Sequence, residues 1–157
     1  METGKKYKLT DECITIDGRK LYRIEALKDF GDVHKGDKGG FIGSEVNLSQ
    51  YGDCWVFGNA AVWGNTEVFG DAEVFGNADV CGNAEVVNNA DYIVFKNWWS
   101  SGRYFTWTRS NNMWLVGCFY GTGAELIAKA YKDSEMSGRE YERVVKYVES
   151  ILKDSKK

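Results

Sequence analysis

The central part of the chain repeats one pattern of apolar and polar residues every six positions, from residue 50 to residue 93. An aliphatic residue is followed two positions later by Gly, then by Asn or Asp, and then by a small residue. The aliphatic positions are Val56, Val62, Val68, Val74, Val80 and Val86, with Tyr92 continuing the row. This period matches neither a helix nor a plain alternating strand, so we expect short strands separated by tight corners.

Each residue type in the repeat suits one place in such a structure. Valine favours a strand and points inward, and Gly-Asn tolerates the positive φ that a tight corner demands. Alanine is small enough to fit inside the bend. Stacked units pair each strand with the one above it, so we expect a continuous buried ladder of valines.

Units of the VFGNAE type resemble the hexapeptide repeats of the left-handed parallel β-helix, in which three units form one triangular turn. The resemblance implies that residues 18 apart stack on one face and that residues 50–93 form between two and three turns. Proteins of this fold are commonly trimers. The resemblance therefore also implies a homo-oligomer, with a trimer favoured.

Residues on either side of each inward valine are expected to face outward. The preceding positions are mostly acidic, and include Glu67, Glu73, Asp79, Glu85 and Asp91. The following positions carry the rings of Phe57, Trp63, Phe69 and Phe75. Exposed ring columns are seldom left in water, so we expect these rings to pack on a neighbouring subunit or on the chain's own flanks. A ligand groove lined by rings is the alternative.

Residues 1–49 predict a β-rich cap and connector. In CITIDGRKLYRI, Asp17-Gly18 separates two apolar-rich runs, which is typical of a β-hairpin. The following stretch, KDFGDVHKGDKGGFIG, predicts a turn-rich connector and contains His34, the single histidine.

Residues 94–157 predict an aromatic β-hairpin followed by a helical cap. RYFTWTR and MWLVGCF alternate in polarity and are joined by residues 110–112. Thr122 with Glu125, and Ser137 with Glu140, match the capping-box pattern that begins a helix. The predicted fold is therefore mainly β: a short left-handed parallel β-helix with an N-terminal hairpin, a C-terminal hairpin and a two-helix cap.

The order of these parts resembles small, largely uncharacterised hexapeptide-repeat proteins encoded by phages and prophages. The resemblance lies in RIEALKDFGDVHKGDKGGFI, the GDCWV entry, the VxGNAx units and GCFYGT. It implies a fold and a genomic context and does not imply a known reaction.

Composition narrows the function classes. A net charge of −3 argues against sequence-independent binding to nucleic acid. The apolar runs are too short to span a membrane, and METGKKYKLTDE lacks the apolar region of a signal peptide. The four cysteines form no CxxC pair, which predicts reduced thiols in a cytoplasmic protein and no zinc site. We expect no metal and no cofactor.

One aromatic stretch predicts a ligand site. Its rings are interleaved with two arginines, and the candidate residues are Trp98, Trp99, Arg103, Tyr104, Trp107, Arg109 and Trp114. Rings stack on bases and guanidinium groups bind phosphates in a bidentate manner, a combination that suits a small nucleotide. The alternative is that the same rings form the core of the hairpin and the arginines its solvated edge.

These observations favour a non-enzymatic phage accessory protein that counters host antiviral defence. It would sequester a small nucleotide immune signal or bind a host defence protein. A structural or assembly oligomer is the first alternative. The second is a hexapeptide-repeat acyltransferase, which would need His34 as its catalytic base.

Overall fold

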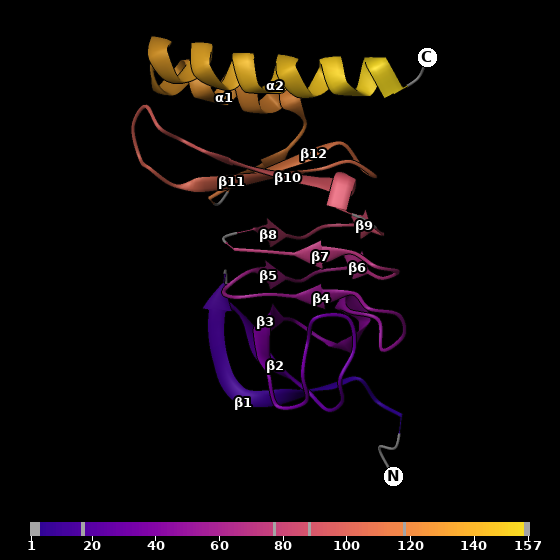
Figure 1. Ribbon diagram of the computed structural model, residues 1–157. Helices are drawn as coiled ribbons and strands as arrows, with labels where there is room; N and C mark the ends of the chain where they lie inside the picture. The colour runs from indigo at the N-terminus through magenta and orange to yellow at the C-terminus, as the bar shows by residue number, and fades with distance from the viewer. Residues whose placement is uncertain (1–3, 17, 77, 88, 118, 156–157) are drawn as a thin grey trace.

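The computed structural model describes residues 4–16, 18–76, 78–87, 89–117 and 119–155. The chain is mainly β with two C-terminal helices. It runs from an N-terminal hairpin, through a stack of short strands, to a cap formed by a sheet and the helices (Figure 1). In the described part of the chain, no helix is both long and apolar enough to cross a bilayer.

The predicted N-terminal hairpin is confirmed. Strands β1 (Tyr7–Ile16) and β2 (Arg19–Ala26) are antiparallel, and Gly18 between them has a φ of +79°. Asp17 lies outside the described residues. Strand β3 (Lys38–Ile42) pairs antiparallel with β2 and parallel with β5 (Ala61–Val62). The predicted connector therefore supplies the first rung of the stack, and the parallel pairing begins before residue 50.

The repeat segment forms two-residue strands that stack in parallel. Besides β5, these are β4 (Trp55–Val56), β6 (Glu67–Val68), β7 (Glu73–Val74), β8 (Asp79–Val80) and β9 (Glu85–Val86). Strand β4 pairs with β7, β5 with β8 and β6 with β9, so that Val56, Val62 and Val68 lie beside Val74, Val80 and Val86. The predicted stacking interval of 18 residues is confirmed by this register.

The interior of the stack follows the sequence pattern. The six repeat valines are at most 1% exposed, and Ala60, Ala72, Ala78 and Ala84 are fully buried inside the corners. The corner residues with positive φ are Gly58, Gly64, Gly70, Gly76 and Gly82. The buried valine ladder and the glycine corners are therefore confirmed.

The N-terminal end of the stack is closed by two residues just before and within β1. Lys6 donates from Nζ to the carbonyl of Cys54 at 2.6 Å, and the Tyr7 hydroxyl donates to the carbonyl of Leu48 at 2.6 Å. Burial lowers the pKa of Lys6 and raises the pKa of Tyr7. These bonds satisfy carbonyl groups that the first turn of the stack would otherwise leave buried and unpaired.

The outward rings are covered to different extents. Trp63 is 6% exposed and packs with Leu21 and Phe41, so the chain's own N-terminal strands cover it. Of the two predicted positions for this ring, a subunit interface or the chain's own flanks, the structure places Trp63 against the flanks. Phe57 stacks on Phe75, with ring centroids 4.6 Å apart, and Phe75 remains 46% exposed.

Phe69 is half-buried and lines a shallow hollow with Val46, which is 63% exposed. Phe57, Phe69 and Phe75 therefore lie on an outer surface that the described chain covers only in part.

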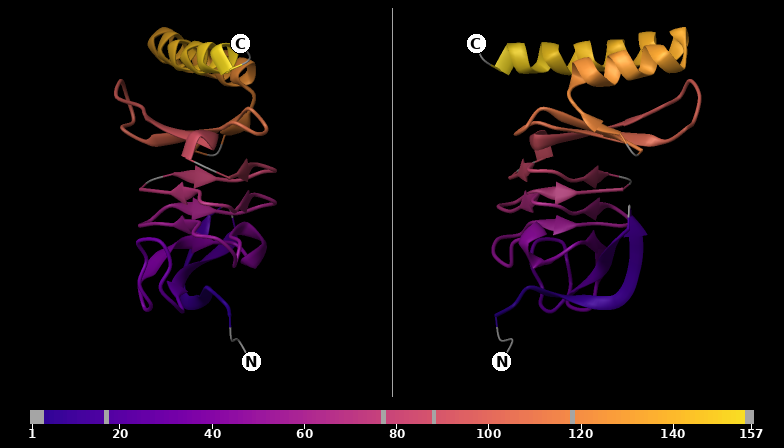
Figure 2. Two further views of the ribbon diagram at one scale, coloured as in Figure 1. Left: turned by 45° about the vertical axis from the view of Figure 1, so that its right-hand side comes forward. Right: turned by 180° about the vertical axis from the view of Figure 1, so that it is seen from behind.

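Beyond the stack, β10 (Tyr92–Lys96), β11 (Tyr104–Thr108), β12 (Met113–Val116) and β13 (Phe119–Gly121) form an antiparallel sheet in that order. The predicted hairpin is β11–β12 within this larger sheet. Helices α1 (Gly123–Asp133) and α2 (Glu135–Ser155) lie on the side of the sheet away from the stack (Figure 2).

The start of α1 is confirmed and the start of α2 is corrected. The Thr122 hydroxyl accepts from the backbone of Glu125 at 3.2 Å, and the Glu125 carboxylate accepts from the Thr122 backbone at 2.9 Å. Helix α2 begins at Glu135 instead of near Ser137, because the Ser134 hydroxyl accepts from the Ser137 backbone at 3.0 Å. A single residue, Ser134, therefore separates the two helices.

Candidate functional site

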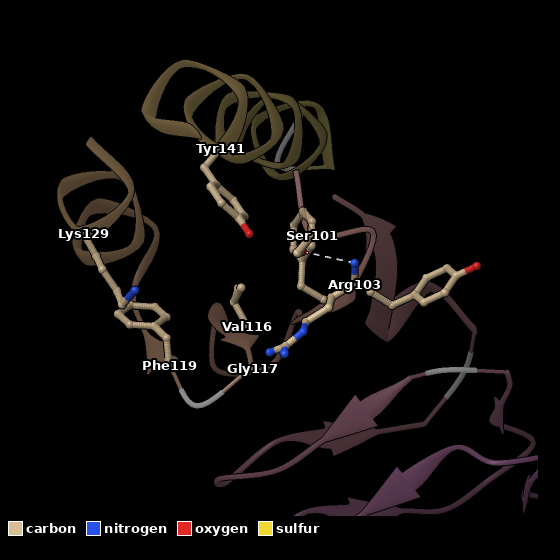
Figure 3. A pocket seen from close by; sticks show the side chains of 9 residues that line it. Ser101, Arg103, Val116, Gly117, Phe119, Lys129 and Tyr141 are labelled. Carbon is tan, nitrogen blue, oxygen red and sulfur yellow. Dashed lines mark hydrogen bonds between the residues drawn. The ribbon is translucent and has the colours of Figure 1, made fainter. Parts of the chain in front are cut away.

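The cap encloses a cavity between its sheet and its helices. The cavity has a volume of about 450 Å³, and β11, β12, β13, α1 and α2 all contribute to it. It is lined by Ser101, Arg103, Tyr104, Phe105, Val116, Gly117, Phe119, Lys129 and Tyr141. Figure 3 shows Lys129 and Tyr141 reaching in from the helices and Arg103 from the opposite side. This combination of rings and cations is typical of a site for a flat, negatively charged molecule.

The loop before β11 is held in shape around Asn97, which is 4% exposed. The Asn97 side chain accepts from the Ser100 backbone at 2.9 Å and donates to the Tyr141 hydroxyl at 3.3 Å. Its backbone N–H donates to the carbonyl of Arg103 at 2.8 Å. The Asn97 side chain therefore ties the loop to α2, and the Asn97 backbone fixes the position of the Arg103 backbone.

Arg103 supplies a cation to the mouth of the cavity. Its side chain is exposed, and a β-carbon added at Gly117 would lie 3.7 Å from Nη1. Among the described residues, no carboxylate lies within ion-pair distance of Arg103. The guanidinium group therefore keeps its donors available for an anion.

Lys129 and Tyr141 add a second cation and a hydroxyl group. Lys129 contacts Asp133 at 3.5 Å, but both side chains are more than half exposed, so this pair is weak and easily rearranged. Burial raises the pKa of Tyr141, and the hydrogen bond from Asn97 only partly opposes this effect. Tyr141 is therefore a neutral phenol near pH 7 and can donate a hydrogen bond.

Several of the predicted ligand-binding rings belong instead to the core of the cap. Trp107 and Trp114 are 0% and 1% exposed, and they pack with Leu126 and Val145 of the helices. Their predicted role as stacking surfaces is therefore corrected, because α1 and α2 already cover them. Trp99 is partly buried edge-on against Tyr141 and donates from Nε1 to the Ser137 hydroxyl at 3.1 Å.

The remaining predicted residues separate into two groups. Arg103 and Tyr104 line the cavity. Trp98 is 67% exposed beside Trp99, and Arg109 donates from Nε to the carbonyl of Ala90 at 3.1 Å. Neither Trp98 nor Arg109 lines the cavity.

Sequence reasoning missed Phe119, Lys129 and Tyr141. Lys129 lies near the buried Leu126 and Ala130 of α1, a position that by itself suggests an ordinary solvated helix residue. The side chain lines the cavity only because the helices dock on the sheet.

A second cavity of about 340 Å³ shares Arg103, Tyr104 and Gly117 with the first. Its lining consists of Asn59, Asp79, Arg103, Tyr104 and Gly117. Burial raises the pKa of the Asp79 carboxyl to about 6. This carboxyl lies where β11 covers the stack, because the Asp79 backbone N–H donates to the Thr106 hydroxyl at 3.2 Å.

His34, the candidate base of an acyltransferase, lies in the turn between β2 and β3. It is exposed, and its backbone N–H donates to the Asp37 carboxylate at 2.9 Å. It lines neither of the two cavities. In the described part of the chain, no group of three or more His, Cys, Asp or Glu residues is arranged to hold a metal ion.

Comparisons with known proteins give limited information. No family model matches the chain. A curated protein described as uncharacterized acetyltransferase YdcK, from Escherichia coli (strain K12), is 39% identical over 61 residues. The match covers 34% of this chain and 19% of that relative. The chain thus spans about a fifth of the length of this relative.

Proposed function

We propose that this protein is a non-catalytic binding protein that sequesters a small nucleotide in the cavity between the cap sheet and the helices. The observation that carries the proposal is that Arg103 and Lys129 line the same cavity as Phe119 and Tyr141. An arginine fork binds phosphate oxygens in pairs, and a lysine adds a mobile positive charge. The rings offer apolar faces to a base.

The resemblance to phage-encoded proteins supports a biological setting for this activity. A protein that holds a nucleotide immune signal lowers the free concentration of that signal and so protects the phage from host antiviral defence. Binding of a host defence protein is the other form of the same proposal. The half-covered surface at Phe57, Phe69 and Phe75 supports it, because partly exposed rings favour contact with another protein.

The stacked rungs support a finer description of the fold. We propose that they form a left-handed parallel β-helix with three sides, since its turn of 18 residues equals three repeat units. We further propose that the protein is a homo-oligomer, with a trimer favoured, whose subunits meet at the same rings. A purely structural or assembly role would use this rigid stack without the cavity.

An acetyltransferase is the second candidate, and the description of the E. coli relative as an uncharacterized acetyltransferase favours it. Such an enzyme needs a base beside its acceptor group. The single histidine, His34, lies in the turn between β2 and β3, whereas the cavity lies in the cap. Turnover of acetyl-coenzyme A that disappears in His34→Ala would favour the enzyme over the binding protein.

The test is a thermal-shift measurement with a panel of nucleotides at fixed ionic strength. At a concentration about 100 times its Kd, a ligand raises the free energy of unfolding by about 2.7 kcal/mol. This raises the Tm of a domain of this size by about 5–10 °C. We expect Arg103→Ala to abolish this rise and to change the ligand-free stability by less than about 0.5 kcal/mol, since its side chain is exposed.

Arg139→Ala is the matched control. It removes one exposed arginine from α2, outside the cavity, and is expected to respond to nucleotides as the unmodified protein does. The proposal fails if no nucleotide shifts the Tm, or if Arg103→Ala and Arg139→Ala show equal shifts.

A further inference from the structure

Arg103 stands at the junction of two cavities, not at the end of one. Arg103, Tyr104 and Gly117 line both the larger cavity beneath the helices and the smaller cavity beside the stack. Gly117 has a φ of +57°, a conformation that favours glycine, and it lies beside the Arg103 guanidinium. The middle part of a ligand that occupies both cavities would therefore lie beside Arg103.

The two cavities differ in chemistry. The larger cavity is lined by Phe105, Val116 and Phe119 and suits a flat apolar group. The smaller one contributes Asp79 and Asn59, which suit a group rich in hydrogen-bond donors. Neither Asp79 nor Asn59 offers a positive charge to a phosphate, so a phosphate would fit poorly beside these two residues and would be drawn to Arg103.

Asp79 differs from Glu67 and Glu85, the exposed acidic residues of its column, and shares its half-buried state with Glu73. Glu67 and Glu85 occupy the same repeat position and are exposed, whereas Asp79 is half-buried under β11. No carboxylate–cation pair involving Asp79 lies within 4 Å among the described residues, although Arg103 lines the same cavity. Burial without a neutralising partner raises its pKa to about 6, so it is mostly an ionised acceptor at pH 7.

Asn59 is held at the rim of the smaller cavity by a residue of β2. Its Oδ1 accepts from Arg23 Nη2 at 3.3 Å, and Arg23 also donates from Nη1 to the carbonyl of Gly39 at 2.7 Å. The N-terminal hairpin thus positions one wall of the smaller cavity, and the stack and the cap supply the other walls.

We infer that the two cavities form one site, and that its ligand carries its phosphates internally, between a base-bearing part and a second sugar. The base lies in the larger cavity, the phosphates lie on Arg103 with Lys129 nearby, and the hydroxyls of the second sugar donate to Asp79. Carboxylates bind ribose hydroxyls in this way in dinucleotide-binding proteins. The inference rests on the proposed nucleotide-binding function and specifies its ligand class as a nucleoside diphosphate that bears a second sugar.

The combined size of the site agrees with this class. The cavities measure about 450 and 340 Å³. Sites for small organic molecules and cofactors usually measure about 300–1,000 Å³, so the two cavities together lie within the usual range for a cofactor-sized ligand.

The test compares ADP-ribose with ADP by isothermal titration calorimetry, because the two probes differ by one ribose on the terminal phosphate. We expect the unmodified protein to bind ADP-ribose about tenfold or more tightly than ADP. Asp79→Ala and the isosteric Asp79→Asn should bring the two affinities to within about threefold of each other, with little effect on ADP.

Asp71→Asn serves as the control, because it removes an exposed carboxylate from a corner position where most repeat units already carry Asn. It is expected to keep the full preference for ADP-ribose. Equal binding of the two probes by the unmodified protein, with Arg103 still required, overturns this inference and leaves the proposed function standing. Binding of neither probe overturns both. A preference that survives in both Asp79 variants overturns the assignment of the second sugar to Asp79.

Discussion

At the scale of single residues, one repeat position takes on different properties according to what covers it. The acidic position before each valine is set by the repeat, and at Glu67 and Glu85 it remains in water. At Asp79 the cap sheet reaches the stack and removes water from the carboxyl, which raises its pKa to about 6. The sequence pattern alone assigns these residues one role, and tertiary packing separates them.

The raised pKa of Asp79 predicts a pH-dependent stability. The folded state holds its proton up to about pH 6, whereas an unfolded Asp loses it near its ordinary value of 3.8. Stability from this group is therefore fully present below about pH 4 and is lost as pH rises to about 6. Asp79→Asn should exceed the unmodified protein in free energy of unfolding by up to about 3 kcal/mol at pH 7 and match it near pH 4.

Urea unfolding at a series of pH values from 4 to 8 measures this difference. The free energy of unfolding of Asp71→Asn should change with pH as that of the unmodified protein does, because Asp71 is exposed. If that of Asp79→Asn also changes in this way, the carboxyl is not desolvated by the cap and its place in the smaller cavity is wrong.

At the scale of elements, β3 shows how the N-terminal strands join the stack. A β-carbon at Gly40 would collide with the carbonyl of Ala60 and would lie 2.7 Å from Val56 Cγ1. The stretch KGGFI therefore needs a glycine here for close approach of two backbones. The strand must lie directly against the first turn, since β3 pairs in parallel with β5.

Gly40→Ala is accordingly expected to lower the free energy of unfolding by about 3 kcal/mol, because the neighbouring atoms are backbone and a buried valine that cannot move aside. Gly36→Ala is the comparison. Gly36 has a φ of +93° with open space around it, so only backbone strain of about 1 kcal/mol is expected. Denaturant unfolding of both variants measures the gap, and equal losses would mean that β3 does not pack on the stack as described.

Local chemistry explains which elements could be predicted from sequence. The valine ladder, the glycine corners and the capping box at Thr122 depend on residues within one repeat unit or one helical turn. The start of α2 was predicted wrongly because Ser134 and Ser137 both fit a cap, and the close packing of α1 on α2 decides between them. The role of KGGFI as a rung depended on pairing with residues about 20 positions away.

The candidate site was predicted only in part for a related reason. Arg103 and Tyr104 were identified because rings and arginines alternate in the sequence near them. Lys129 and Tyr141 reach the cavity only because two helices dock on the sheet, and neither carries a local signal. Trp107 and Trp114 were misassigned because a ring that stacks on a ligand and a ring that packs under a helix look alike in sequence.

At the scale of the whole molecule, the stack acts as a rigid support between two ends with different roles. The N-terminal strands close one end, and the cap sheet with its helices covers the other (Figure 1). Both cavities lie in the cap or where the cap meets the stack, and together they draw residues from the repeats, the sheet and the helices. A site assembled in this way depends on the complete fold.

Native mass spectrometry of the intact protein mixed with nucleotides tests the central claim most directly, because it counts bound molecules and subunits together. The account predicts one nucleotide per chain on the unmodified protein and on Arg139→Ala, and none on Arg103→Ala at the same concentrations. Absence of any bound nucleotide on the unmodified protein, or equal occupancy of Arg103→Ala, would contradict it.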